Sequence, residues 1–148
     1  MMSLEDGMRK FIVLVFSAAA ICTVSCSQKI DPKTPLLENA VKMSEEKDNS
    51  KIPSFYTDGT VAAAEAFSRK AGGTDILSGL DRKLFVKGSA WSLKSETKDG
   101  DAATVVIVIT AHPARNMIGY EATIPLRFEH GSWKLDRESY IRSLVTAQ

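Results

Sequence analysis

The feature that most limits the fold of this 148-residue chain is a strict alternation of apolar and polar positions between residues 120 and 129. The apolar residues are Tyr120, Ala122, Ile124, Leu126 and Phe128. A period of two predicts a β-strand that turns one face to the core and the other to solvent. Pro125 lies in the polar phase and has no backbone N–H, so we expect it at a sheet edge or a bulge.

The neighbouring segments predict the other strands of an antiparallel sheet. Residues 103–111 contain an unbroken run of Val and Ile, which is typical of a central strand buried on both faces. Residues 98–101 (Lys-Asp-Gly-Asp) are a strong hairpin signal, so a strand is expected before them as well. A short last strand is expected at Trp133 and Leu135. Residues 139–145 fit either another strand or a short helix.

The segment before the strands has a helical period instead. One helix is expected from Asp58 or Thr60 to about Lys70, where the glycine pair at 72–73 would end it. A second short helix is expected after a cap at Thr74 or Asp75. The residues that would share its apolar face are Ile76, Leu77, Leu80 and Leu84. The sequence therefore predicts an α+β domain over residues 57–148, with two short helices packed on a curved antiparallel sheet.

The N-terminus has the three parts of a signal peptide. Basic residues at 9–10 precede an apolar run over 11–22, and small residues follow up to Cys26. The run is too short for a comfortable transmembrane helix, which needs roughly 20 residues. We expect residues 1–25 to be removed, and translation to start at Met1 or at Met8.

Residues 23–26 (Thr-Val-Ser-Cys) resemble the bacterial lipobox, whose commonest form has Leu where this chain has Thr23. The resemblance implies cleavage before Cys26, a diacylglycerol thioether on its sulfur and often a further acyl chain such as palmitate. Two or more chains anchor a protein stably in a membrane. Ser27 resembles the sorting signal for the outer membrane. Residues 26–56 are polar and contain three prolines, so we expect a tether there, with a possible short helix after Thr34.

Composition limits the classes of partner. The chain has 19 basic and 18 acidic residues, so its charge gives no reason to expect nucleic acid as a partner. Cys22 and Cys26 are both N-terminal, which leaves the domain without an internal disulfide or a thiolate metal site. His112 and His130 are expected in separate loops, and no nucleotide-binding motif is present. We therefore expect no metal and no cofactor.

Residues 60–137 resemble small bacterial lipoproteins of the NTF2-like (cystatin-like cone) superfamily, especially the DUF4878-type group. The most suggestive piece is Gly-Ser-Trp-Lys-Leu at residues 131–135, after a helix and strands in the matching order. The resemblance implies helices packed on a curved sheet that forms a cone. It says little about function, because the superfamily includes enzymes, carriers, toxin and immunity domains, and assembly modules.

Several residues are candidates for a site inside such a cone. The aromatic residues that could line a pocket, or simply fill the core, are Trp91, Tyr120, Phe128 and Trp133. Enzymes of this fold class commonly use an Asp or Tyr, and the candidates are Tyr56, Asp75, Asp81, Tyr120 and Asp136. Asp75 is explained by a helix cap and Asp81 by a solvated helix face, so neither needs a catalytic role. The favoured interpretation of the aromatic residues is core packing.

These observations favour a lipid-anchored lipoprotein of the cell envelope whose domain is a non-enzymatic binding or assembly module. Its expected partners are the membrane, through lipid on Cys26, and an envelope protein or small apolar ligand. In a bacterium with two membranes, the expected place is the outer membrane, facing the periplasm. The alternatives are a small envelope enzyme with a cone-shaped pocket and an accessory subunit of a secretion or envelope machine.

Overall fold

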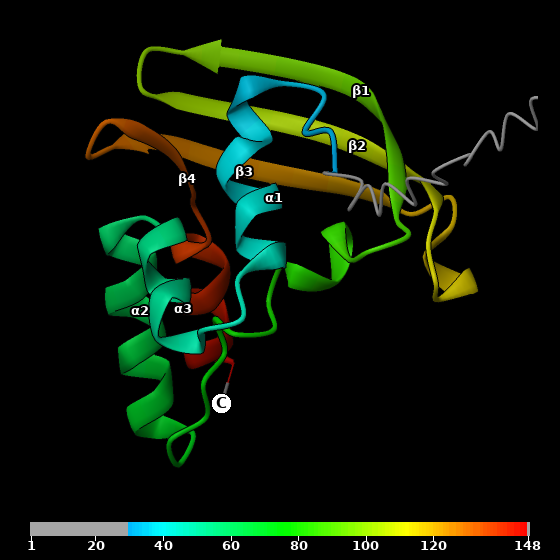
Figure 1. Cartoon of the computed structure of the whole chain (residues 1–148). Coiled ribbons are helices and arrows are strands. Elements are labelled where there is room, and N and C mark those ends of the chain that lie inside the picture. The colour runs from blue at the N-terminus through cyan, green and yellow to red at the C-terminus, as the bar shows by residue number, and fades with distance from the viewer. Residues whose placement is uncertain (1–29, 148) are drawn as a thin grey trace, which may run out of the picture.

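The computed structural model describes residues 30–147, and its centre is a four-stranded antiparallel sheet in the order β1-β2-β3-β4 (Figure 1). The strands are β1 (Ala90–Asp99), β2 (Ala102–Ala111), β3 (Glu121–Glu129) and β4 (Ser132–Leu135). Each strand pairs with the next along the chain, which confirms the predicted meander. Gly100 and Gly131 form the tight turns with φ of +58° and +79°, a region that glycine occupies without steric cost.

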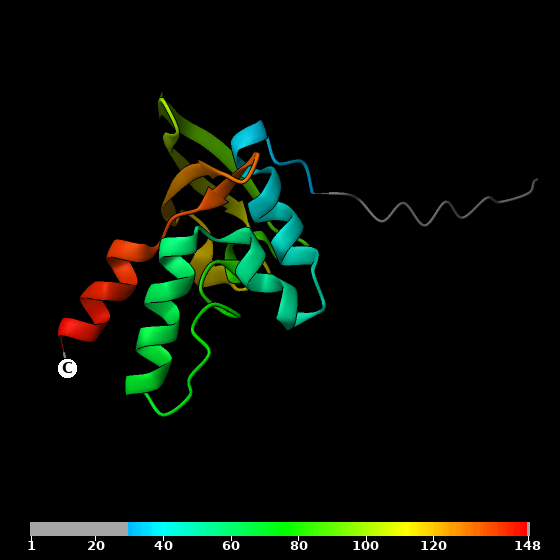
Figure 2. The ribbon, with the colours of Figure 1, turned by 90° about the vertical axis from the view of Figure 1, so that its left-hand side faces the viewer.

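The described helices lie on one face of the sheet and below it. The α-helices are α1 (Glu38–Glu45), α2 (Asp58–Lys70) and α3 (Glu138–Thr146), and the 3₁₀ helices are Pro35–Leu37, Asn49–Phe55, Arg82–Phe85 and Arg115–Met117. α1 lies against the sheet beside β4, and α2 and α3 lie side by side below it (Figures 1 and 2). The α+β class is confirmed, and residues 139–145 are helical.

The core lies on a single face of the sheet. On β2, Val105 and Ile107 are fully buried and belong to the same cluster as the apolar residues of α1. Val106 and Val108 point to the opposite face and are only half-buried. The expectation that this strand is buried on both faces is therefore wrong, because α1 covers only the face that carries Val105 and Ile107.

The alternation on β3 holds in its middle and fails at its ends. Ala122, Ile124 and Leu126 are at most 4% exposed, as their phase predicts. Tyr120 and Phe128 have the same phase but are 53% and 45% exposed, so their expected burial is corrected. The strand direction sets which face a side chain takes, but burial also needs a covering layer, which does not reach these two positions.

The segment expected to be a tether contributes to the core. Thr34 Oγ1 accepts a hydrogen bond from the Leu36 backbone N–H at 3.3 Å, which confirms the predicted cap. The buried residues that follow are Leu36, Leu37, Ala40, Val41, Met43, Ile52 and Tyr56. The Asn39 side chain also donates to the Trp133 carbonyl on β4 at 2.8 Å. The folded domain therefore begins by Thr34, and the expected boundary at residue 57 is corrected.

The expected second helix is replaced by turns and a short 3₁₀ helix. Asp75 Oδ1 accepts from the backbone N–H groups of Leu77 and Ser78, as a cap would. The chain then continues in turns, and the first regular element is the 3₁₀ helix Arg82–Phe85. An Asp side chain that bonds to the following N–H groups stabilises a turn without requiring that a helix follow.

Within residues 30–147, none of the helices has the length and apolar character needed to cross a bilayer. The expected signal peptide and Cys26 lie outside the described residues.

Candidate functional site

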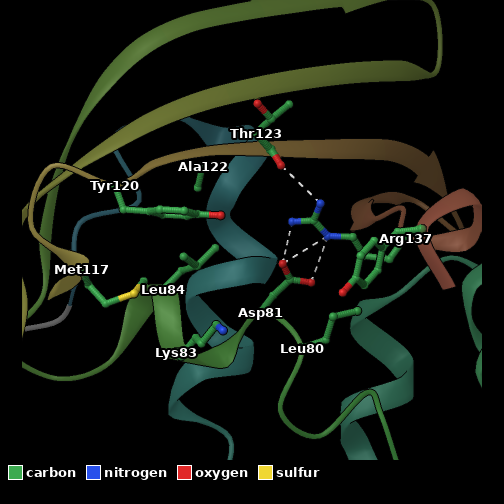
Figure 3. Close-up of a pocket in the computed structure, with 10 residues that line it drawn as sticks. Leu80, Asp81, Lys83, Leu84, Met117, Tyr120, Ala122, Thr123 and Arg137 are labelled. Carbon is green, nitrogen blue, oxygen red and sulfur yellow. Dashed lines mark hydrogen bonds and ion pairs between the residues drawn. The ribbon is translucent and has the colours of Figure 1, made fainter. Parts of the chain in front are cut away.

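A buried ion pair between Asp81 and Arg137 lies beside the sheet (Figure 3). Arg137 Nη2 donates to Asp81 Oδ1 at 2.6 Å, and Nε lies 3.1 and 3.2 Å from the two carboxylate oxygens. The Tyr56 hydroxyl donates to Asp81 Oδ2 at 3.1 Å. Asp81 is 2% exposed and Tyr56 is fully buried. Both carboxylate oxygens therefore accept hydrogen bonds, from the fully buried Tyr56 and from Arg137, whose side chain is 17% exposed.

Segments far apart in the sequence bring these three groups together. Asp81 immediately precedes the 3₁₀ helix Arg82–Phe85, and Tyr56 forms an isolated bridge to β4. Arg137 stands between β4 and α3, and its backbone N–H donates to Thr60 Oγ1 at 2.8 Å. The ion pair therefore joins the loop before β1 to the junction of β4 and α3.

The electrostatics of this cluster favour a structural role over proton transfer. Burial, and then the negative charge of Asp81, raise the pKa of the Tyr56 hydroxyl far above its usual value of 10.0. Tyr56 therefore keeps its proton at neutral pH and acts only as a donor. A useful general acid or base instead needs a pKa near the working pH.

A pocket of about 330 Å³ opens next to the ion pair. Its lining residues are Leu80, Asp81, Lys83, Leu84, Met117, Tyr120, Ala122, Thr123, Arg137 and Tyr140. Figure 3 shows the Tyr120 ring extended across the pocket, with its hydroxyl directed toward the Arg137 guanidinium. Leu84 and Met117 lie on one side of that ring, opposite Ala122. The pocket is thus apolar along one side and carries hydrogen-bond donors at one end, which is the usual character of a ligand site.

Of the four aromatic candidates, only Tyr120 lines this pocket. Trp91 is 4% exposed and packs edge-on against Phe85, with ring centroids 4.9 Å apart, so it is a core residue. The ring centroids of Phe128 and Trp133 lie 5.5 Å apart, and neither residue lines the pocket. The core interpretation thus holds for Trp91, while Tyr120 is a pocket residue.

The acid–base candidates do not all belong to one site. Tyr56 and Asp81 are joined in the buried cluster, so the interpretation of Asp81 as a solvated residue is wrong. Asp75 is a turn cap, as expected. Asp136 Oδ1 accepts from the Glu138 backbone N–H at 3.3 Å, one position before Arg137, the N-cap residue of α3. Arg137, the central donor of the site, was not among the sequence candidates.

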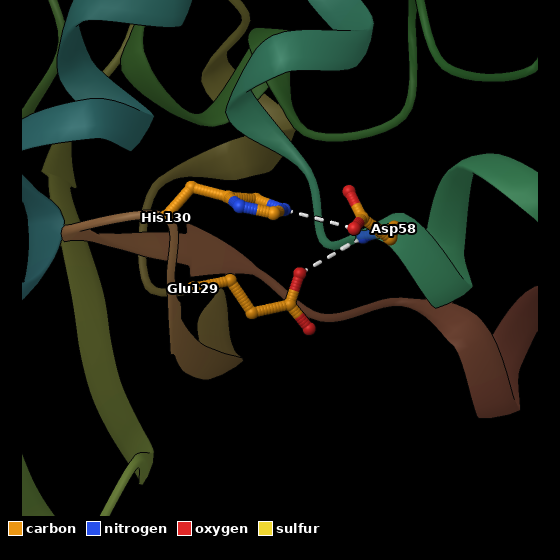
Figure 4. Close-up of side chains that lie close together, drawn as sticks. All are labelled: Asp58, Glu129 and His130. Atoms are coloured by element: carbon orange, nitrogen blue, oxygen red, sulfur yellow. Dashed lines mark hydrogen bonds and ion pairs between the residues drawn. The ribbon is translucent and has the colours of Figure 1, made fainter.

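A second cluster gathers Asp58, Glu129 and His130 at the turn between β3 and β4 (Figure 4). One ligand atom from each lies within 4.8 Å of the others. His130 Nε2 is already 2.8 Å from Asp58 Oδ2, and Glu129 accepts from the Asp58 backbone N–H at 3.0 Å. These contacts place a carboxylate at the N-terminus of α2 and connect the turn to that helix.

Comparison with protein-family models, with curated proteins and with solved structures found no match.

Proposed function

We propose that this protein is a lipid-anchored lipoprotein of the cell envelope and that its domain is a non-enzymatic binding module. The binding site is the pocket beside Arg137, and its ligand has an apolar part and at least one hydrogen-bond acceptor. In a bacterium with two membranes, the proposed place is the outer membrane, facing the periplasm. The observation that carries the proposal is the combination of apolar walls and unused Arg137 donors in one pocket.

The donors of Arg137 support a polar end for the ligand. A guanidinium group has five N–H donors. In the described part of the chain, Nε and one N–H of Nη2 bond to Asp81, and one N–H of Nη1 bonds to the Thr123 carbonyl at 3.2 Å. Two N–H groups remain, and the Tyr120 hydroxyl is directed toward the guanidinium group. Because Asp81 balances the charge of Arg137, the site suits a neutral acceptor such as a carbonyl.

The same contacts argue against the enzyme alternative. A small envelope enzyme would need a carboxylate or tyrosine that is free to exchange protons in the pocket. Asp81 accepts from Arg137 and Tyr56 through both oxygens, and Tyr56 is held in its neutral form. These two groups maintain the fold, so neither is available as the catalytic acid or base of a small envelope enzyme.

The short distance along the chain from Cys26 to the core supports a domain that lies at the membrane surface. Ile30 packs against the core, only four residues after Cys26. An extended chain spans at most about 3.6 Å per residue, so this connection reaches about 14 Å. A lipid on Cys26 would therefore hold the domain at the membrane surface, in place of the long tether expected from the sequence.

Lipidation is tested by labelling cells with a fatty acid analogue. We expect the wild-type protein to incorporate the label and Cys26→Ala to lose it, because the Cys26 sulfur is the proposed attachment atom. Cys22→Ala is the matched control and should label like the wild type. Equal labelling of wild type and Cys26→Ala would refute the anchor.

Ligand binding is tested with 6-propionyl-2-(dimethylamino)naphthalene, an uncharged dye with a carbonyl group that fluoresces in apolar sites. We expect Tyr120→Ala to weaken dye binding about fivefold, because the loss of one aromatic contact costs about 1 kcal/mol. Ile118→Ala is the control, since Ile118 is 51% exposed and lies near Tyr120 in sequence but does not line the pocket. Equal affinities for the two variants, or no dye binding at all, would contradict a ligand site here.

A further inference from the structure

Part of β3 has a strand on one side only. β2 pairs with β3 along Glu121–Arg127, whereas β4 pairs only with Leu126–Glu129. Beyond β4 the chain makes one more backbone contact with β3, from the Asp136 N–H to the Pro125 carbonyl at 2.9 Å. In the described structure, residues 121–124 therefore form a free sheet edge on the side away from β2.

The backbone groups on this free edge follow from the strand's alternation. The Tyr120 carbonyl and the Phe128 N–H bond toward β2, so even-numbered residues direct their backbone groups to that side. The carbonyls of Thr123 and Pro125 bond on the other side, to Arg137 and Asp136. The N–H and carbonyl of Glu121 and the N–H of Thr123 therefore face outward. Pro125 has no backbone N–H, so its position on this edge leaves no donor without a partner.

The pocket lies at this same edge, because Tyr120, Ala122 and Thr123 are among its lining residues. We propose that the ligand is an extended peptide segment of a partner protein, which adds to the free edge of β3 as a further strand. One apolar side chain of the segment enters the pocket between Tyr120 and Leu84. The proposal rests on the pocket being the binding site, as set out above, and specifies what that site binds.

Hydrogen-bond complementarity selects a peptide over a small molecule. The edge offers a donor and an acceptor at Glu121 and a donor at Thr123, spaced as in a β-ladder. A peptide backbone presents the complementary groups at the same spacing, and its side chains alternate toward and away from the pocket. Further along, the unused N–H groups of Arg137 can reach a carbonyl of the same segment.

β1, the strand at the opposite edge of the sheet, differs from the free edge of β3. The register of β1 shifts between Leu93 and Ser95, which marks a bulge or irregularity, and its residues 92–99 are exposed with several charges. Bulges and charged residues are devices that discourage pairing with another chain. No β1 residue lines the pocket, so of the two edges of the described sheet it is the free edge of β3 that combines unpaired backbone groups with this pocket.

The test measures amide hydrogen exchange by mass spectrometry on protein isolated from cells that make the full chain, held in lipid nanodiscs if it carries lipid. The probes are capped pentapeptides Thr-Thr-X-Thr-Thr, with Leu, Ile, Met or Phe at X, at millimolar concentration. For at least one peptide, at ten times its Kd, we expect the exchange of two amides within residues 119–124 to slow about tenfold. Amides of β1 should not change.

Two controls distinguish strand addition from ligand binding in the pocket alone. The same peptides carrying N-methyl groups on the central amides cannot donate to the Glu121 carbonyl, and they should give no protection. Tyr120→Ala should weaken protection, and Ile118→Ala should not. Equal protection by the methylated peptides would overturn strand addition and leave the pocket standing. Dye binding without protection by any peptide would overturn the peptide ligand alone, and failure of both would overturn both proposals.

Discussion

Replacing Arg137 with Met is expected to lower the free energy of unfolding by about 3–5 kcal/mol. Met has a similar length but leaves the Asp81 carboxylate, 2% exposed, without its cationic partner. Removing one member of a buried ion pair costs far more than the pair itself contributes, because the remaining charge stays out of water. The loss should appear as a lower midpoint in urea unfolding.

A double-variant cycle isolates the cause. Asp81→Leu combined with Arg137→Met removes both charges, so its loss should be well below the sum of the two single losses. Arg127→Met is a control on the exposed surface, where the side chain lies 3.5 Å from Asp136, and it should cost at most about 1 kcal/mol. Additive losses in the cycle would mean that Asp81 and Arg137 are not coupled.

The contact between Asp81 and Arg137 could not be predicted from the sequence. Asp81 lies within a run of Leu77, Leu80 and Leu84 whose spacing fits one helical face, and on such a helix Asp81 would point to solvent. The run forms turns and a 3₁₀ helix instead, so the positions opposite the leucines no longer face outward. The partner of Asp81 stands 56 positions later, and a single sequence contains no signal for a contact at that separation.

The sheet was predictable because its signals are local. The alternation in the middle of β3 and the hairpin turn at Gly100 each involve neighbours in the chain, and each agrees with the structure. Exposure at Tyr120 and Phe128 was not predictable, because it depends on where α1 and the loops end above the sheet. Tyr120 still proved to be a pocket residue, since its phase directs it toward the covered side.

The domain boundary expected at residue 57 was wrong for a related reason. Residues 44–51 are mostly polar and charged, and such composition is typical of linkers. On either side of these polar residues, however, Met43 and Ile52 are at most 1% exposed and belong to the core. Isolated apolar residues give no periodic signal, although each contributes to the core.

A chain that starts at Thr57 is therefore expected to show no cooperative unfolding. It would lack five large aliphatic side chains that are buried in the intact domain, namely Leu36, Leu37, Val41, Met43 and Ile52. Burial of each such side chain is worth about 1.5–3 kcal/mol, so their combined loss is comparable to the whole net stability of a domain, about 5–15 kcal/mol. The shortened chain would also lose Tyr56, one of the donors to the buried Asp81.

The control is a chain that starts at Ser27, which keeps Ile30 and every buried residue of the described structure. It should melt in a single transition when followed by circular dichroism, while the chain from Thr57 should give a broad, sloping curve. A single sharp transition for the shorter chain would mean that residues 57–148 close a core by themselves. The 3₁₀ and α1 segments would then be a removable cover, and the sheet face that carries Val105 and Ile107 would have to repack against α2 and α3.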